Sequence, residues 1–217
     1  MDSKKIITDK AHDLFFLQGI RSVTMNEIAL RIGMSKKTIY KFFGNKEILV
    51  MAIIEKRVEE NTVTVNNLKN KQQDAVMKLF FILSHIRSMY AKVTSPIIHD
   101  LEKYYSSSYA ILLRHRNEFI YQVIDQVIAE GIMQRLFRDD FHTHRMSRFF
   151  LESVAIVSDI KIFPDTEMES KDLANEIFGL LLNGIATTDG SELIEHYKKQ
   201  RELFMLVTPQ HHIFWNA

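Results

Sequence analysis

Hydrophobic residues recur every three or four positions through most of the chain, which is the spacing of amphipathic helices. Residues 3–18 give the first such stripe, and Gly19 directly after it favours a helix end. No alternating run of polar and apolar residues indicates a strand, because pairs such as Ile156-Val157 lie within helical periodicity. The pattern therefore predicts an all-α protein.

Two short helices are predicted after the first one. Thr24 and Glu27 have the spacing of a capping box, in which each side chain accepts a hydrogen bond from the backbone N–H of the other. The helix that starts there is short, because Gly33 follows after barely two turns and can adopt the left-handed conformation that ends a helix. Ser35 is then the N-cap of the next helix, which we expect to end at Gly44.

Longer helices are predicted for the rest of the chain. Asn45 is placed to cap a fourth helix that begins KEILVMAII. Ser95-Pro96 starts another, since proline at the first helical position loses no hydrogen bond. The three serines at 106–108 interrupt the pattern. The remaining expected helices cover residues 73–92, 109–130 with an end at Gly131, 143–162, 171–187 and 191–206.

Two short helices joined by a tight turn are typical of a helix-turn-helix. Ala29 is small where the two helices would cross, and three isoleucines supply a core that fixes the crossing angle: Ile28, Ile32 and Ile39. The exposed side of the second helix would present a basic, hydrogen-bonding surface that fits a DNA major groove: Lys36, Lys37, Thr38, Tyr40 and Lys41. The alternative interpretation is a helical hairpin whose lysines serve solubility.

The distribution of charge agrees with a nucleic-acid contact at the N-terminal end. The chain of 217 residues has a formal net charge of only +1. Residues 1–50 nevertheless contain nine Lys/Arg and five Asp/Glu, a net of +4, whereas residues 51–217 carry a net of −3. A basic N-terminal segment followed by a mildly acidic remainder is compatible with a polyanionic partner. A basic surface that is only solvated would have the same net charge.

Composition argues against several classes of protein. The chain has no cysteine, which rules out disulfides, zinc ribbons and thiol nucleophiles. No apolar run approaches the roughly 18 to 20 residues that span a bilayer, and the start MDSKKIITDKAHD lacks the features of a signal peptide. We therefore expect a cytoplasmic protein with no membrane partner. Motifs such as G-x-S-x-G, the P-loop and H-E-x-x-H do not occur, so we expect no enzymatic activity and no cofactor.

The segment that carries the motif resembles the tetracycline-repressor (TetR) family of bacterial transcriptional regulators over roughly residues 5–50. The matching positions are Gly19, Thr24, Ile28-Ala29, Gly33-Met34-Ser35, Thr38-Ile39-Tyr40, Phe43 and Lys46-Glu47-Ile48-Leu49. The resemblance implies a three-helix helix-turn-helix domain, residues 1–48, followed by a larger helical-bundle domain, residues 49–217. It further implies a homodimer on a double-stranded DNA operator, with a larger domain that binds a small molecule and then releases the DNA.

Carried onto this sequence position by position, the family's motif implies the contacts to DNA. Phosphates would be held by Thr24, Tyr40 and Lys46, and base edges or the adjoining backbone would be faced by Lys36, Lys37, Thr38 and Lys41, with the cap Ser35 completing the set. Two positions depart from the pattern. Lys37 stands where many relatives have glycine, and Phe42 stands where relatives often carry a polar aromatic residue or histidine.

A sensing pocket in the larger domain would be lined by apolar and aromatic side chains with a few polar groups that orient the ligand. The expected effector is accordingly small and largely apolar or aromatic. The same residue types at helical spacing also form ordinary cores, and this interpretation stays open. The candidates are Phe81, His85, Met89, Tyr90, Tyr104, Tyr105, His115, Phe119, Phe149, Ser153 and Val157.

The dimer surface of the family resembles a four-helix bundle made by two long helices of each subunit. In this chain these would be the helix that ends near Ile162 and the helix that follows it. The candidate dimerisation residues are Leu173, Ile177, Leu180, Leu181, Gly184 and Ile185. Gly184 would let two helices approach closely, or it would mark a fraying helix end.

Other functions remain as alternatives. His142, His144 and His211-His212 could share a metal ion. The chain has no cysteine and no neighbouring Glu-rich cluster, so exposed loop and tail histidines are the better interpretation, and we predict no metal site. Within regulation, the alternatives are an activator and a regulator that is controlled by a protein partner. A helical-bundle carrier or enzyme for a hydrophobic ligand is the alternative from a different class. The lysines at 36, 37 and 41 argue against that alternative, because binding a hydrophobic ligand does not require three lysines on one exposed surface.

Overall fold

The computed structural model describes residues 3–71, 74–92, 95–159, 162–163 and 170–199. These residues form helices and no strand, apart from an isolated antiparallel bridge between Phe137 and Ala186, so the all-α prediction is confirmed. No helix among them has the length and apolar character that crossing a bilayer requires. The expected C-terminal end of the last helix, the histidines at 211–212 and the tail from Thr208 to Ala217 lie outside the described residues.

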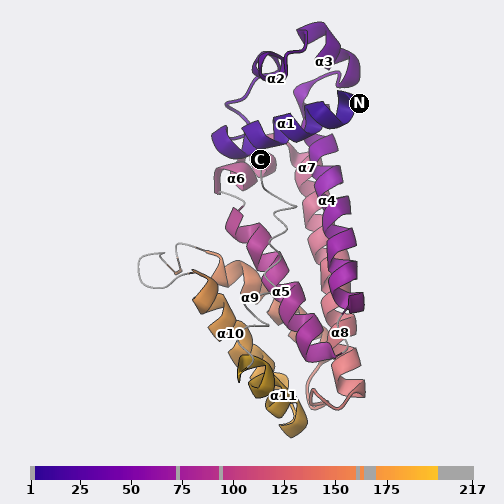
Figure 1. The fold of residues 1–217 in the computed structure, drawn as a ribbon, viewed down its shortest axis with the longest axis vertical. Coiled ribbons are helices and arrows are strands. Elements are labelled where there is room, and N and C mark those ends of the chain that lie inside the picture. Colours follow the sequence, from indigo (N-terminus) through magenta and orange to yellow (C-terminus); the bar gives the residue numbers. More distant parts are fainter. Residues whose placement is uncertain (1–2, 72–73, 93–94, 160–161, 164–169, 200–217) are drawn as a thin grey trace. The chain divides into compact units, whose positions relative to one another are not determined.

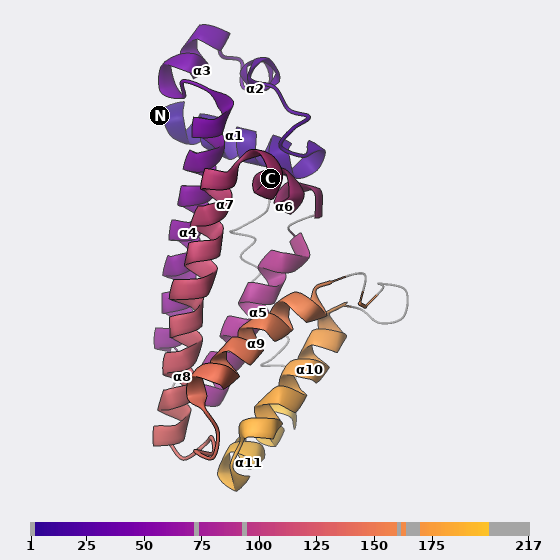
Figure 2. The ribbon, with the colours of Figure 1, turned by 180° about the vertical axis from the view of Figure 1, so that it is seen from behind.

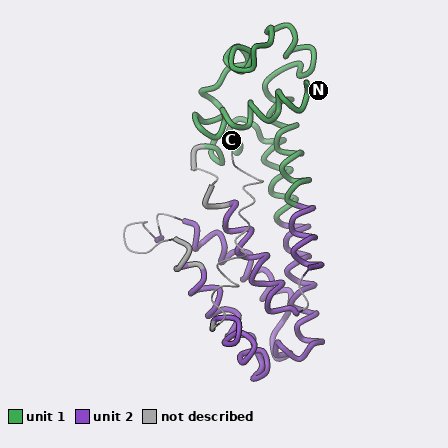
Figure 3. Tube along the Cα trace, viewed as in Figure 1, with its two compact units in different colours: residues 1–61, 92–116, 213–217 green, residues 62–91, 117–212 purple. Residues whose placement is uncertain are grey.

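The chain forms two compact units (Figure 3). Of the described residues, those up to 61 and from 92 to 116 belong to unit 1, and those from 62 to 91 and from 117 onward belong to unit 2. Unit 1 thus combines the N-terminal helices with residues that lie far along the chain. The functional boundary expected at residue 48 falls inside helix α4 (Lys46–Lys71), which contributes to both units.

Unit 1 packs the N-terminal helices against later ones (Figures 1 and 2). Its elements are α1 (Ser3–Gln18), α2 (Met25–Arg31), α3 (Lys36–Phe42), the first part of α4, α6 (Ser95–Tyr104) and α7 (Ser106–Arg114). The predictions of the first three helices are confirmed to within two residues. Fully buried side chains of its core are Ile7, Ile28, Ile39, Leu49 and Leu101.

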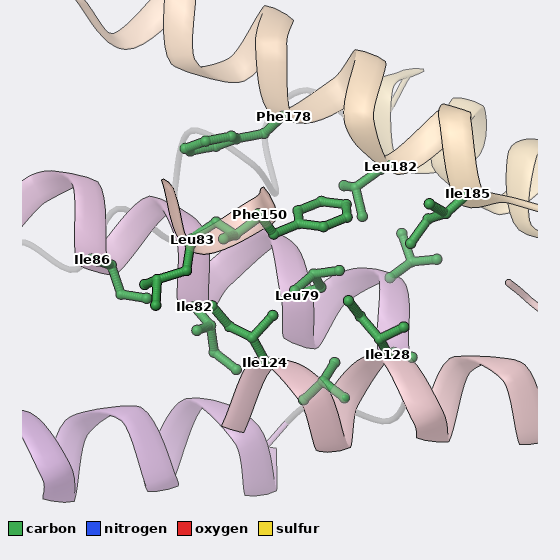
Figure 4. Packing of buried hydrophobic residues seen from close by; sticks show 14 of the residues in the cluster. Leu79, Ile82, Leu83, Ile86, Ile124, Ile128, Phe150, Phe178, Leu182 and Ile185 are labelled. Carbon is green, nitrogen blue, oxygen red and sulfur yellow. The ribbon is translucent and has the colours of Figure 1, made fainter. Parts of the chain in front are cut away.

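Unit 2 is a bundle of longer helices around one apolar core. Its elements are the rest of α4, α5 (Ala75–Lys92), α8 (Tyr121–Met133), α9 (Thr143–Val157), α10 (Ser170–Ile185) and α11 (Thr188–Lys199). Figure 4 shows the ring of Phe150 on α9 between side chains of α5 and α10. Phe150 and Phe178 have no exposed surface, and together with leucines and isoleucines of α5 and α8 they fill the centre of the bundle.

The helix predicted for residues 109–130 is part of a longer helical stretch. Helix α7 begins at Ser106, so the serines at 106–108 start the helix instead of interrupting it, and Ser108 is fully buried. The stretch continues through a π-helical segment, η1 (His115–Ile120), into α8. The predicted end at Gly131 is wrong, because Gly131 lies inside α8 where a Cβ atom would come within 2.1 Å of the Phe137 ring. Gly131 is therefore needed for the close packing of the Phe137 ring against α8, and it does not end the helix.

The last helices also differ from the prediction at their ends. Helix α9 ends at Val157 and not at Ile162. Helix α11 starts three residues before residue 191, because Thr187 Oγ1 accepts a hydrogen bond from the N–H of Gly190 (3.1 Å) and caps it. Gly190 therefore lies in the helix, where a Cβ atom would come within 2.0 Å of the carbonyl oxygen of Leu136.

Candidate nucleic-acid interface

Both short helices of the N-terminal segment start at the predicted caps. Thr24 Oγ1 accepts a hydrogen bond from the N–H of Glu27 (3.2 Å), and Ser35 Oγ accepts one from the N–H of Thr38 (3.1 Å). Both cap residues have the extended backbone conformation that an N-cap adopts. The first turns of α2 and α3 are thus fixed by side chains that can be identified from sequence.

The turn between α2 and α3 is a Schellman motif. The N–H of Met34 donates to the carbonyl of Ala29 (3.0 Å), and the N–H of Gly33 donates to the carbonyl of Leu30 (3.2 Å). Gly33 has a φ of +66°, which a residue with a side chain rarely adopts. This turn sets the direction in which α3 leaves α2.

A small apolar core holds the two helices from one side. Ile28 and Ile39 have no exposed surface, Ala29 is buried as expected, and Val23 and Phe43 are buried in the same core. Because this side of α3 is packed against the core, the opposite side faces solvent.

The solvent side of α3 is cationic. Lys36, Lys37 and Lys41 are exposed, the sequence KKTIYKF of this helix contains no acidic residue, and Tyr40 keeps 41% of its surface exposed. The Nζ of Lys36 lies 5.7 Å from the centre of the Tyr40 ring. Thr38 is half-buried, and its Oγ1 lies 2.8 Å from Ser35 Oγ. Ammonium and phenol groups of this kind can bind phosphate oxygens and base edges.

Lys46 differs from the lysines of α3, because its ammonium group is already held within unit 1. Its Nζ donates a hydrogen bond to the carbonyl of Arg21 (3.3 Å) and lies 5.7 Å from the centre of the Phe15 ring. Partial burial lowers the pKa of Lys46, and the negative charge of Asp100 opposes this effect. An ammonium group has three donors, so the bond to Arg21 leaves it able to bind a phosphate.

The predicted pocket residues fall into both units. Unit 1 holds Tyr104, Tyr105 and His115, and unit 2 holds Phe81, His85, Met89, Phe119, Phe149, Ser153 and Val157, while the side chain of Tyr90 lies outside what the structure describes. Phe149 is 52% exposed on α9, so it does not line the interior of unit 2, unlike the buried Phe81 and Ser153.

Among the predicted pocket residues, His115 has a buried polar partner on α4. It begins η1, and its Nε2 lies 2.7 Å from Oδ1 of Asn61, which is a buried residue of α4. Burial lowers the pKa of His115 to about 4, so the ring is neutral at physiological pH.

The predicted dimerisation residues lie on two sides of α10. Leu180 is 66% exposed and Gly184 is exposed, whereas the three other apolar residues of this side pack partly against the core: Leu173, Ile177 and Leu181. Ile185 is only 2% exposed and belongs to the core of unit 2, which removes it from an outer surface. On α9, Phe149 and Ile156 are exposed and lie seven residues apart, which places them on one face.

The surroundings of His142 and His144 do not resemble a metal site. Among the described residues, no group of three or more His, Asp or Glu side chains is arranged to hold an ion. The Nδ1 of His144 lies 3.0 Å from Oδ1 of Asp125, which also accepts a hydrogen bond from Ser147 Oγ (2.8 Å).

Sequence reasoning did not identify the contacts that α6 makes with the loop before α2. Asp100 was not a candidate for any role, and Tyr104 was placed in the pocket, but its hydroxyl accepts a hydrogen bond from Arg21 (2.9 Å). The two partners are separated by 83 residues, and no local pattern predicts such a pair.

Comparison with known proteins supports the interpretation of the helix-turn-helix. Residues 7–53 match the model of the bacterial regulatory proteins of the tetR family. The HTH-type transcriptional regulator YvaF of Bacillus subtilis (strain 168), itself uncharacterised, is 21% identical over 175 residues, which cover 79% of this chain and 90% of YvaF.

Two solved structures share the fold. A TetR-family transcriptional regulator from Agrobacterium tumefaciens has a TM-score of 0.67 at 16% identity, covering 85% of this chain and 97% of that one. The transcriptional regulator FadR from Bacillus subtilis, solved in complex with stearoyl-CoA, has a TM-score of 0.63 at 17% identity, covering 83% of this chain and 98% of FadR. Residues 7–53 thus form a DNA-binding segment of the tetR family of bacterial regulatory proteins, and the chain as a whole shares the fold of these transcriptional regulators.

Proposed function

We propose that this protein is a repressor that binds a palindromic operator as a homodimer and leaves the DNA when a small, largely hydrophobic effector binds. The observation that carries the proposal is the exposed cationic side of α3, fixed by the caps Thr24 and Ser35 and by the turn at Gly33. The residues proposed to contact DNA are Thr24, Ser35, Lys36, Lys37, Thr38, Tyr40, Lys41 and Lys46. We assign the protein no catalytic step and place its action in the cytoplasm, where an operator is accessible.

Dimerisation follows from the small size of one helix-turn-helix. A single recognition helix reads only a few base pairs, and a twofold dimer doubles the site and makes it palindromic, with half-sites about one helical turn apart or a multiple of it. The apolar surface of unit 2 supports a dimer through α9 and α10, because Phe149, Ile156 and Leu180 are large apolar residues that remain exposed.

The dimer surface can be tested by introducing a charge at its most exposed apolar position. Leu180→Glu should break the dimer and weaken operator binding together, because a carboxylate in an apolar interface is costly to desolvate. Met133→Glu, which adds the same charge at a 78% exposed position of α8, serves as the control. Sedimentation that shows an unaltered dimer for Leu180→Glu would move the interface elsewhere.

The effector is proposed to be largely apolar, with one or two polar groups that orient it. FadR of Bacillus subtilis, which shares the fold, was solved with stearoyl-CoA, so this architecture can hold a ligand with a long acyl chain. In this chain the candidates for such an orienting group are His85 in unit 2 and, separately, Tyr105 or His115 in unit 1. Release of DNA requires that the effector bind the DNA-incompetent state more tightly, and DNA must then weaken effector binding by the same factor.

Selection of bound fragments from the source genome, followed by affinity measurement on the recovered sequence, tests the whole proposal. The expected result is a palindromic site, bound by a dimer, whose affinity falls when a bound hydrophobic ligand saturates the protein. Stearoyl-CoA is the first ligand to try, with coenzyme A as its control. Failure to enrich any sequence would contradict DNA recognition. Unchanged operator affinity across chemically diverse bound ligands would favour control by a protein partner.

A further inference from the structure

Helix α6 holds the loop between α1 and α2 through both the backbone and the side chain of one residue, Arg21. The N–H of Arg21 donates a hydrogen bond to Oδ2 of Asp100 (2.9 Å), and its Nη1 donates one to the hydroxyl of Tyr104 (2.9 Å). The guanidinium carbon also lies 4.5 Å from the centre of the Tyr104 ring. All three residues belong to unit 1, so these contacts lie within one compact body.

The same loop is held from the other side by the start of α4. The carbonyl of Arg21 accepts the hydrogen bond from Lys46 Nζ, so the two backbone polar groups of Arg21 bond to α6 and α4 respectively. Ile20 and Val23, on either side of the exposed segment, are buried in the core of unit 1. The loop is therefore held at Ile20, Arg21 and Val23, and it leads directly to the cap Thr24.

We propose that Asp100 and Tyr104 are positioning residues for operator binding. They fix the loop at Arg21, and this loop places Thr24 and the ammonium group of Lys46, which are two of the proposed phosphate contacts. Neither α6 residue needs to touch DNA for this role. The proposal rests on the proposed function, since it concerns the geometry of the same DNA-binding surface.

The charge of Asp100 separates a positioning role from a purely electrostatic one. A carboxylate near a DNA-binding surface repels phosphates, so its removal by itself should tighten DNA binding. If Asp100 positions the loop, its removal should weaken binding, because Lys46 and Thr24 lose the geometry that they need. The two roles predict changes of opposite sign.

The experiment compares Asp100→Ala with Glu102→Ala on the operator selected for the wild-type protein. Glu102 lies on the same helix, is exposed and carries the same charge, so it reproduces the electrostatic change without the contact to Arg21. Asp100→Ala should lower operator affinity about tenfold, as expected for loss of a hydrogen bond to a charged group, and Glu102→Ala should leave it equal or slightly higher. Tyr104→Phe keeps the ring, removes only the hydroxyl, and should lower affinity about threefold.

The salt dependence of binding provides a readout that a general loss of folded protein would not change. If Lys46 no longer reaches its phosphate in either subunit, the log–log slope of affinity against salt should fall by about two units for Asp100→Ala. Loss of active protein alone would lower the apparent affinity at an unchanged slope. If Asp100→Ala folds poorly, Tyr104→Phe, which is a smaller change in the same contact, tests whether this contact positions the loop for operator binding.

The outcomes separate this inference from the function on which it rests. A wild-type protein that selects no DNA sequence would overturn the proposed function and the inference with it. A wild-type protein that binds its operator, with Asp100→Ala and Tyr104→Phe binding as tightly as Glu102→Ala, would overturn the inference and leave the function standing.

Discussion

The helix-turn-helix of unit 1 and the bundle of unit 2 are both helical, but different interactions hold them in place. Helices α2 and α3 have seven residues each and depend on side-chain caps, a Schellman turn and a small core around Ile39. The helices of unit 2 are longer and share one apolar core that is centred on residues such as Phe150. Short helices cannot bury much surface, so local hydrogen bonds must set their geometry.

This difference explains why function can be inferred for one region and not for the other. In α3 the packed side and the solvent side carry different residue types. The lysines at 36, 37 and 41 can therefore be recognised from sequence as a candidate DNA-binding surface. In unit 2 the residues suited to an apolar ligand are the same types that fill a core. Phe81 and Phe149 look alike in sequence, yet one is buried and the other is half exposed.

The largest expected effect is the loss of core packing in unit 2. Phe150→Ala should lower the free energy of unfolding by about 3–5 kcal/mol, because it removes a fully buried ring and leaves a cavity. Met133→Ala, at a 78% exposed position of α8 outside the proposed dimer surface, should cost less than about 1 kcal/mol. Denaturant unfolding at a fixed protein concentration measures both, and similar costs for the two variants would contradict the burial of Phe150 in the core of unit 2.

The next largest effect is a difference in stability between two Gly→Ala variants. One glycine lies against a buried ring, and the other has room for a methyl group. Gly131→Ala should destabilise the protein by about 1–3 kcal/mol, because the added Cβ atom overlaps the buried ring of Phe137. Gly179→Ala brings its added Cβ no closer than 3.8 Å to the flexible end of the Lys198 side chain and should stabilise α10 by up to about 1 kcal/mol. Thermal unfolding of the two variants should therefore shift in opposite directions, and a shift of both in the same direction would contradict the prediction.

A smaller effect concerns pH and lies in unit 1. Burial lowers the pKa of His12 and of His115 to about 4, from the ordinary value of 6.5. Below pH 6.5 the unfolded chain binds protons that the folded chain does not, so stability should fall as the pH drops from 6.5 to about 4 and stay level above 6.5. The midpoint of urea unfolding, followed against pH, measures this loss.

A variant that cannot titrate separates His115 from other acid-sensitive groups. His115→Gln keeps a side-chain donor for Asn61 and should make the loss of stability between pH 6.5 and 4 shallower. Identical profiles for the wild type and His115→Gln would show that this histidine does not contribute.

Sequence predicts best what depends on neighbours in the chain. The caps at Thr24 and Ser35 and the turn at Gly33 depend on residues within a few positions, and all three are confirmed. The role of Gly131 depends on a ring that folds back onto it, and the partner of Arg21 lies on a distant helix. Such contacts follow from tertiary packing, so neither local spacing nor residue type reveals them in advance.

Binding of DNA by the solvent side of α3 can be measured through the salt dependence of operator affinity. Replacing Lys36, Lys37 and Lys41 together by alanine should reduce affinity strongly and lower the log–log salt slope by up to about five units per dimer, at roughly 0.9 per phosphate contact. A matched triple variant in unit 2, at Lys69, Lys71 and Lys198, should keep the slope of the wild type. Equal affinities and equal slopes for the two triple variants would show that DNA does not bind at the solvent side of α3.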